Sequence, residues 1–154
     1  MSTPTFTATT PQAYDSPRAI AARRALLYSQ ILIASSAYTS TQTGLTFDVP
    51  PGGNLLVWLV CTAASGTGGL TLKIEIQDPT SLVWLNIGQD SAARTSVLNL
   101  GFAVGPGAGN SGTLTNSSFV TKQFPVAGKC RVTVSHGDAS SYTYSVNALV
   151  MGPG

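Results

Sequence analysis

Apolar and polar residues alternate with a period of two over much of the chain from about residue 30 onward. The clearest run is residues 70–77, where every second residue is Leu or Ile and each intervening residue is polar. Such alternation is typical of a half-buried β-strand. Residues 55–64 are apolar at both alternating sets of positions, which indicates a central strand. We expect strands over residues 45–49, 55–64, 70–77, 82–87, 95–104, 119–124, 129–136 and 142–150.

Turn-forming residues separate these segments at intervals of roughly 8–12 residues, as in sandwiches and barrels. They include Pro50-Pro51-Gly52-Gly53, a glycine-rich stretch at 65–69, Asp78-Pro79 and Gly137-Asp138, and a long glycine-rich loop is expected at 105–112. The pattern predicts one all-β domain over residues 29–154. We expect an antiparallel β-sandwich or barrel-like fold of about eight to nine strands.

Residues 1–28 follow a different pattern and are predicted to form an N-terminal arm. The first sixteen residues lack apolar periodicity and contain Pro4 and Pro11, which favours an extended or disordered segment. Ser16-Pro17 is a suitable helix start, and good helix formers follow it. The arm is therefore expected to carry a short helix to about Tyr28, which would need a surface to lie on.

The chain contains unusually few charged residues. Apolar residues make up an ordinary 43% of the chain, but charged residues make up only 9%, against roughly a quarter in typical soluble domains. Such a surface relies little on charge repulsion and suits a subunit packed in an assembly. A secreted β-domain has a similar composition, and both interpretations stay open at this point.

The net charge of +2 is too small to indicate nucleic-acid binding. Its position is more informative, because Arg18, Arg23 and Arg24 against Asp15 account for all of it and the remaining charges cancel. These arginines either lie in solvent or contact an acidic partner surface.

No apolar run is long enough to cross a bilayer, and the polar N-terminus does not resemble a signal peptide. We therefore expect a protein made and kept in a cytoplasm. Cys61 and Cys130 lie inside strand-like runs, where buried free thiols are the expected state and a disulfide between them is the alternative.

Residues that could support catalysis or cofactor binding are sparse. A single histidine, His136, and the absence of a C-x-x-C pair give no zinc motif. The glycine-rich stretch at 105–112 lacks the Lys-Ser/Thr ending of a phosphate-binding loop. Most aspartates fall at expected strand ends or turns, where they commonly cap loops. We expect no enzymatic activity, no metal and no cofactor.

Two groups of residues allow both a structural and a functional interpretation. His136 and Asp138 flank a predicted hairpin turn, so a hydrogen bond across it is expected to stabilise the turn; a triad with Ser140 is the alternative. Aromatic residues at strand positions are usually core residues, but a sugar-binding platform is the alternative for Trp58, Trp84, Tyr142 and Tyr144.

Residues 33–150 contain a series of strand and turn motifs in a characteristic order. They are Ala-Ser-Ser-Ala (34–37), Pro-Gly-Gly-Asn-Leu (51–55), Thr-Ala-Ala (62–64), Leu-Thr-Leu-Lys-Ile-Glu-Ile-Gln-Asp-Pro (70–79), Arg-Val-Thr-Val-Ser-His-Gly-Asp (131–138) and Tyr-Thr-Tyr-Ser-Val (142–146). In the order of these motifs the chain resembles a family of small β-rich virion proteins of tailed bacteriophages, some of which are similar to head decoration, or cement, proteins. The resemblance implies a β-sandwich and a structural role in the virion, and it transfers no catalytic residues.

Together these features predict a capsid decoration protein on the outside of a phage head, assembled in the host cytoplasm. Its expected partners are major capsid protein subunits and further copies of itself, with a trimer favoured, and neither nucleic acid nor membrane. The alternatives are a tail-associated carbohydrate-binding or host-adhesion module, and a tail or head-completion subunit. The arm residues expected to contact the partner are Pro17, Arg18, Ile20, Arg23, Arg24 and Leu27.

Overall fold

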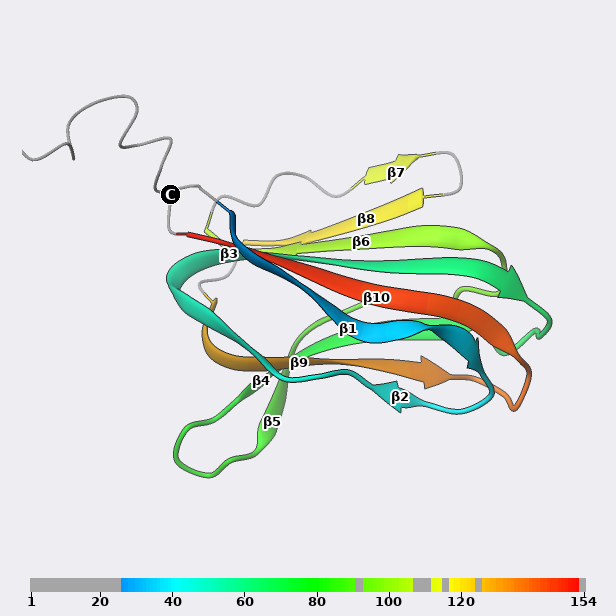
Figure 1. Cartoon of the computed structure of the whole chain (residues 1–154), viewed down its shortest axis with the longest axis horizontal. Coiled ribbons are helices and arrows are strands. Elements are labelled where there is room, and N and C mark those ends of the chain that lie inside the picture. Colours follow the sequence, from blue (N-terminus) through cyan, green and yellow to red (C-terminus); the bar gives the residue numbers. More distant parts are fainter. Residues whose placement is uncertain (1–25, 91–92, 107–111, 115–116, 124–125, 153–154) are drawn as a thin grey trace, which may run out of the picture.

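The computed structural model describes residues 26–90, 93–106, 112–114, 117–123 and 126–152. These residues form ten β-strands and no helix (Figure 1). The strands are β1 (Leu26–Tyr38), β2 (Gln42–Thr43), β3 (Phe47–Ala64), β4 (Leu70–Gln77), β5 (Trp84–Gln89), β6 (Leu98–Val104), β7 (Gly112–Leu114), β8 (Ser117–Lys122), β9 (Val126–His136) and β10 (Tyr142–Met151).

The strands form two sheets that share β3, and the fold is an open β-sandwich. Sheet A has the order β1-β10-β3-β6-β8-β7, and sheet B has the order β5-β4-β9, with β2 and the first part of β3 on the far side of β9. All pairings are antiparallel except that of β6 with β8. The predicted all-β class and sandwich architecture are confirmed.

Strand β3 passes from one sheet to the other. Its first residues pair with β9, Phe47 opposite Cys130, whereas the part from Asn54 onward lies between β10 and β6. The turn predicted at residues 50–53 is instead a bend inside this one strand, so that prediction was wrong. Two prolines lack the N–H groups of a regular ladder, and Gly52 has a φ of 72°, so the chain changes direction here without ending the strand.

The core lies between the sheets and follows the alternation of the sequence. In β10 every second residue from Tyr142 to Val150 is buried, and in β4 the three residues Leu70, Leu72 and Ile74 are buried, as predicted. Buried residues of both sheets belong to one continuous cluster. Because the inward positions are filled by Val, Leu, Ile and Tyr, this cluster supplies the main driving force for folding.

The structure corrects the expected end of the N-terminal helix. Residues Leu26–Tyr28 belong to β1, which pairs with β10, and the rest of the expected helix lies outside the described residues. The apolar run of β1 does not show a regular period of two, because its register with β10 shifts at three places. These irregularities explain why the sequence did not reveal this strand.

The Tyr142 hydroxyl fixes the loop between β3 and β4. Tyr142 is fully buried, and its oxygen accepts a hydrogen bond of 2.8 Å from the Gly69 backbone N–H, which is itself buried. Tyr38 offers a contrasting case, since its hydroxyl donates to the Ala34 carbonyl at 2.7 Å in an exposed position. An unsatisfied polar group costs far more in the interior than at the surface.

We therefore expect Tyr142→Phe to lower the free energy of unfolding by about 1–3 kcal/mol, because the buried Gly69 N–H loses its acceptor. The control Tyr38→Phe is expected to cost less than about 1 kcal/mol. Urea unfolding followed by circular dichroism measures both. Equal losses in the two variants would contradict this role for Tyr142.

Candidate protein-binding surfaces

Five of the six predicted arm residues, Pro17, Arg18, Ile20, Arg23 and Arg24, lie outside the described residues. The sixth, Leu27, lies at the start of β1, and its side chain is 53% exposed. Its neighbour Leu26 is 55% exposed. The described structure therefore presents two apolar side chains to solvent at the point where the chain enters sheet A.

The main feature of sheet A is the absence of charge over four adjacent strands. Strands β1, β10 and β6 contain no Asp, Glu, Lys, Arg or His, and neither does the part of β3 that lies in this sheet. The charged residues of the described sheets lie mainly in sheet B. The two outer faces of the sandwich thus differ in electrostatic character.

The outward side chains of these four strands are apolar or neutral polar. The register places Trp58 of β3 between Asn147 of β10 and Gly101 of β6, and Ile31 of β1 on the other side of Asn147. Ile31 is 62% exposed, Trp58 and Asn147 are half-buried, and Gly101 is buried. We call this surface the sheet A face; its apolar members are Ile31, Leu56, Trp58, Val60, Leu149 and Met151.

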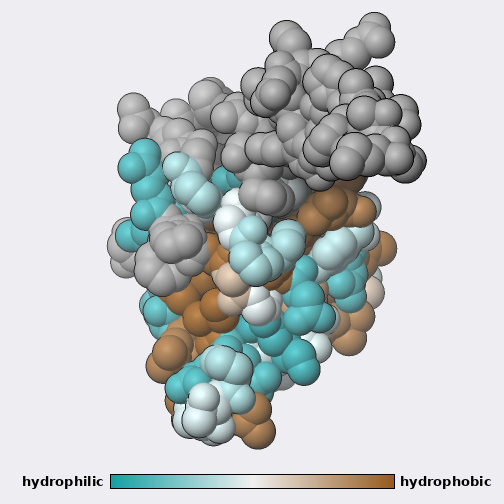
Figure 2. All heavy atoms as spheres, turned by 90° about the vertical axis from the view of Figure 1, so that its left-hand side faces the viewer, coloured by the Kyte–Doolittle hydropathy of each residue, from teal (hydrophilic) through white to brown (hydrophobic). Residues whose placement is uncertain are grey.

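A second apolar surface lies on the β4–β5 hairpin, in the loop and at the start of β5. Leu82, Val83 and Leu85 are each more than half exposed. The hairpin that carries them projects from the sandwich in Figure 1, and Figure 2 shows apolar side chains among polar ones at the corresponding lower end. Exposed apolar residues gathered on a projecting loop are typical of protein contact sites.

Internal hydrogen bonds hold this loop in shape. The Asp78 carboxylate accepts bonds from the Thr80 N–H at 2.8 Å and the Ser81 hydroxyl at 2.9 Å. These bonds lower the pKa of Asp78, and the bond from the Thr80 N–H contributes most. Leu82 has a φ of 60°, the left-handed conformation that is unfavourable for a leucine. The predicted capping role of Asp78 is confirmed, and Leu82 lies in the turn rather than in the expected strand.

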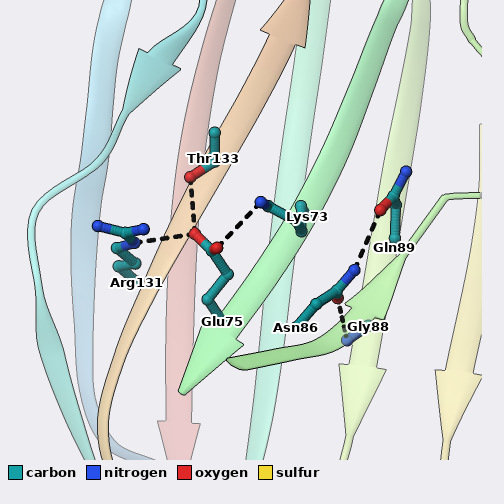
Figure 3. A network of polar contacts seen from close by, with 7 residues as sticks. All are labelled: Lys73, Glu75, Asn86, Gly88, Gln89, Arg131 and Thr133. Atoms are coloured by element: carbon teal, nitrogen blue, oxygen red, sulfur yellow. Dashed lines mark hydrogen bonds and ion pairs between the residues drawn. The ribbon is translucent and has the colours of Figure 1, made fainter. Parts of the chain in front are cut away.

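Sheet B carries a polar cluster on its outer face, centred on Glu75 (Figure 3). The alternation placed this residue on the solvent side, yet it is only 4% exposed. Its carboxylate contacts Arg131 Nε at 2.8 Å, the Thr133 hydroxyl at 2.9 Å and Lys73 Nζ at 2.9 Å. The pairing of β4 with β9 brings these side chains together, and sequence alone does not supply that register.

The surroundings of Glu75 keep it ionised. Burial alone would raise its pKa, but hydrogen bonds from Arg131, Lys73 and Thr133 outweigh burial and lower the pKa to about 2. The Arg131 guanidinium also lies over the Trp84 ring, with its Cζ 4.3 Å from the ring centroid. Arg131 therefore links the carboxylate to β5, and the cluster joins three strands of sheet B.

The predicted hydrogen bond between His136 and Asp138 is not formed, so that prediction was wrong. His136 Nε2 lies 3.1 Å from the Tyr144 hydroxyl, and its Nδ1 is buried without a hydrogen-bond partner among the described residues. Asp138 instead accepts bonds from the backbone N–H groups of Gly68 and Ser140, at 2.7 and 3.0 Å. It stabilises the turn as predicted, but it does so by tying two neighbouring loops together.

The four aromatic residues considered as a sugar platform do not share a surface. Tyr142 and Tyr144 are fully buried in the core, as the predominant interpretation predicted. Trp58 lies on the sheet A face, and Trp84 lies on sheet B beneath Arg131. The arrangement does not form a single stacking platform from these residues.

Both cysteines are buried free thiols, as predicted, with Cys61 in sheet A and Cys130 in sheet B. Among the described residues, no three His, Cys, Asp or Glu side chains are grouped as metal ligands. The same part of the chain contains no helix with the length and apolar character needed to cross a membrane.

The described residues define an open β-sandwich with two exposed apolar surfaces. No protein-family model and no curated protein matches the chain. Among solved structures, it is similar to CorA, a surface-associated copper-binding protein important in copper acquisition in Methylomicrobium album BG8. The two are 10% identical with a TM-score of 0.32, over 82% of this chain and 92% of that chain. Likeness at this level carries no argument about function.

We expect Glu75→Gln to lower the free energy of unfolding at pH 7 by about 1–3 kcal/mol, because Arg131 and Lys73 lose their shared carboxylate. The folded-state pKa is depressed, so the stabilisation by Glu75 is complete above the unfolded value of about 4.5 and declines as pH falls towards about 2. Urea unfolding at pH 7 and pH 2 measures the difference.

The matched control is Asp48→Asn, which removes one exposed carboxylate from the same sheet. It is expected to change the free energy of unfolding by less than about 0.5 kcal/mol. A difference between wild type and Glu75→Gln that stays constant from pH 7 to pH 2 would contradict the assigned role of the Glu75 charge.

Proposed function

We propose that this chain is a non-enzymatic structural protein of a tailed-phage virion, a decoration protein that binds the outside of the head. The observation that carries the proposal is the outer face of β1, β10, β3 and β6 in sheet A, which exposes apolar and neutral polar side chains instead of the charges usual on soluble domains. Surfaces depleted of charge and enriched in aromatic and aliphatic residues suit protein contacts. The sequence resemblance of residues 33–150 to small β-rich virion proteins supports a location in the virion.

In the proposed mechanism the domain contributes contact area and the N-terminal arm joins neighbouring capsid subunits. Arg18, Arg23 and Arg24 pair with acidic capsid residues, and Ile20 packs on an apolar site. Leu26 and Leu27 then continue this contact into β1, because both are exposed at the edge of sheet A. Many copies act on one particle, so weak single contacts sum to a large stabilisation of the shell.

The rigid β4–β5 loop fits the same function as a second contact. Its shape is fixed before binding by the Asp78 hydrogen bonds, so little conformational entropy is lost when Leu82 or Val83 enters an apolar depression of a partner. A tail or head-completion subunit is the alternative use of these surfaces, and it differs in assembling into rings.

We expect deletion of residues 1–25 to weaken binding to isolated capsids at least about tenfold, because the arginines and the arm contact area are lost. The deletion ends before Leu26, so strand β1 stays complete. Co-sedimentation of the protein with capsids lacking it, at two salt concentrations, measures binding. The full-length triple variant Arg18→Gln, Arg23→Gln, Arg24→Gln is expected to lose part of the affinity and most of its salt dependence.

Circular dichroism serves as the control that both variants remain folded. Undiminished binding by the truncated protein would remove the arm mechanism. Failure of the full-length protein to bind capsids, with formation of rings in solution, would favour the tail or head-completion alternative over decoration.

A further inference from the structure

The chemistry of the sheet A face limits which kind of protein surface can pack on it. Its polar members, among them Thr143, Ser145 and Asn147 on β10, carry hydroxyl and amide groups that both donate and accept hydrogen bonds. Its remaining members are apolar, and the four strands carry no formal charge. The surface is therefore compatible with a copy of itself, since no like charges meet and either copy can supply a donor or an acceptor.

A charged partner surface would fit this face poorly. Covering a charge without an opposite charge or hydrogen bonds removes it from water at a large cost, and this face has no ion to offer in return. Sheet B differs in this respect, because its outer face carries the Lys73, Glu75 and Arg131 cluster. The sheet A face therefore suits an uncharged partner surface.

The size of the face is appropriate for a stable contact. Four strands about 4.8 Å apart span roughly 15–20 Å; β6, with seven residues, is about 23 Å long, and β10, with ten, is about 33 Å long. Side-chain relief raises the accessible area above this flat outline, towards the roughly 800 Å² per partner of a standard interface. Homodimer interfaces are also more apolar than other protein surfaces, as this face is.

We propose that the sheet A faces of two copies of this chain pack against each other in a two-fold dimer. Trp58 and Asn147 lie near the centre of the contact, since they are register neighbours on the two middle strands, and Ile31 lies at its β1 side. Face-to-face packing of one surface on itself closes at two subunits, in place of the trimer expected from the sequence. The proposal does not depend on the virion role, and the arm and the β4–β5 loop remain available to other partners.

The test introduces one charge into the centre of the face. Wild-type protein is expected to sediment as a dimer at micromolar concentrations, and Asn147→Glu is expected to weaken the dimer at least about tenfold, because two like charges are buried opposite each other. Thr71→Glu is the matched control, since Thr71 lies on the outer face of sheet B, and it is expected to remain dimeric. Analytical ultracentrifugation measures all three.

A mixture of two oppositely charged variants makes the test specific. An equimolar mixture of Asn147→Glu and Asn147→Lys is expected to recover dimers that neither variant forms alone. If Asn147→Glu fails to fold by circular dichroism, Ser145→Glu replaces it on the same face. A monomeric wild type, an Asn147→Glu variant that dimerises as tightly as wild type, or loss of the dimer on removing residues 1–25 overturns the proposal. Because no capsid takes part, these outcomes are separate from those of the decoration test.

Discussion

The structure depends on the double pairing of β3. The first part of this strand forms the far edge of sheet B beside β9, and the rest forms the middle of sheet A between β10 and β6. The two layers are therefore joined by continuous backbone at the bend near Gly52 and Gly53. Gly53 is buried there, and a Cβ atom would lie only 2.9 Å from the Pro50 carbonyl oxygen, so a larger residue would force the bend itself to shift. Tyr28 adds a second connection by donating a hydrogen bond from β1 to the Asp48 carbonyl of sheet B.

This arrangement separates two surface chemistries on one small domain. Sheet B carries an internal ion-pair cluster in which Glu75 is held between Lys73 and Arg131, and Asp90 is paired with Arg94 at 2.6 Å just beyond β5. Sheet A leaves apolar and neutral polar groups on its outside. Since β3 belongs to both sheets, the relation between the two surfaces is fixed by the fold. A protein of this kind can present one surface to its own copies and another to a different partner.

Much of the fold could be predicted from the sequence, because alternation in β4, β9 and β10 directly reflects burial of every second residue. Strand β1 is not predictable where register shifts break that alternation. The residue types of the Pro50–Gly53 segment predict a turn, because prolines and glycines occur both in turns and in a bend within a strand. The candidate surfaces could be predicted only in part. The lack of charge in β1, β10 and the part of β3 from Asn54 onward is visible in the sequence, but only the pairing shows that these segments are adjacent. The Glu75 cluster likewise requires the β4–β9 register.

The two buried thiols also have a practical consequence. Burial raises the pKa of Cys61, and burial together with the Asp48 charge raises that of Cys130 to about 12, so almost no thiolate is present at neutral pH. Since the thiolate is the species that reacts with alkylating reagents, the folded chain resists modification. One thiol belongs to each layer. The rate at which each is alkylated therefore reports how often its own sheet opens, and the native sequence contains a separate reporter of local unfolding for each half of the sandwich.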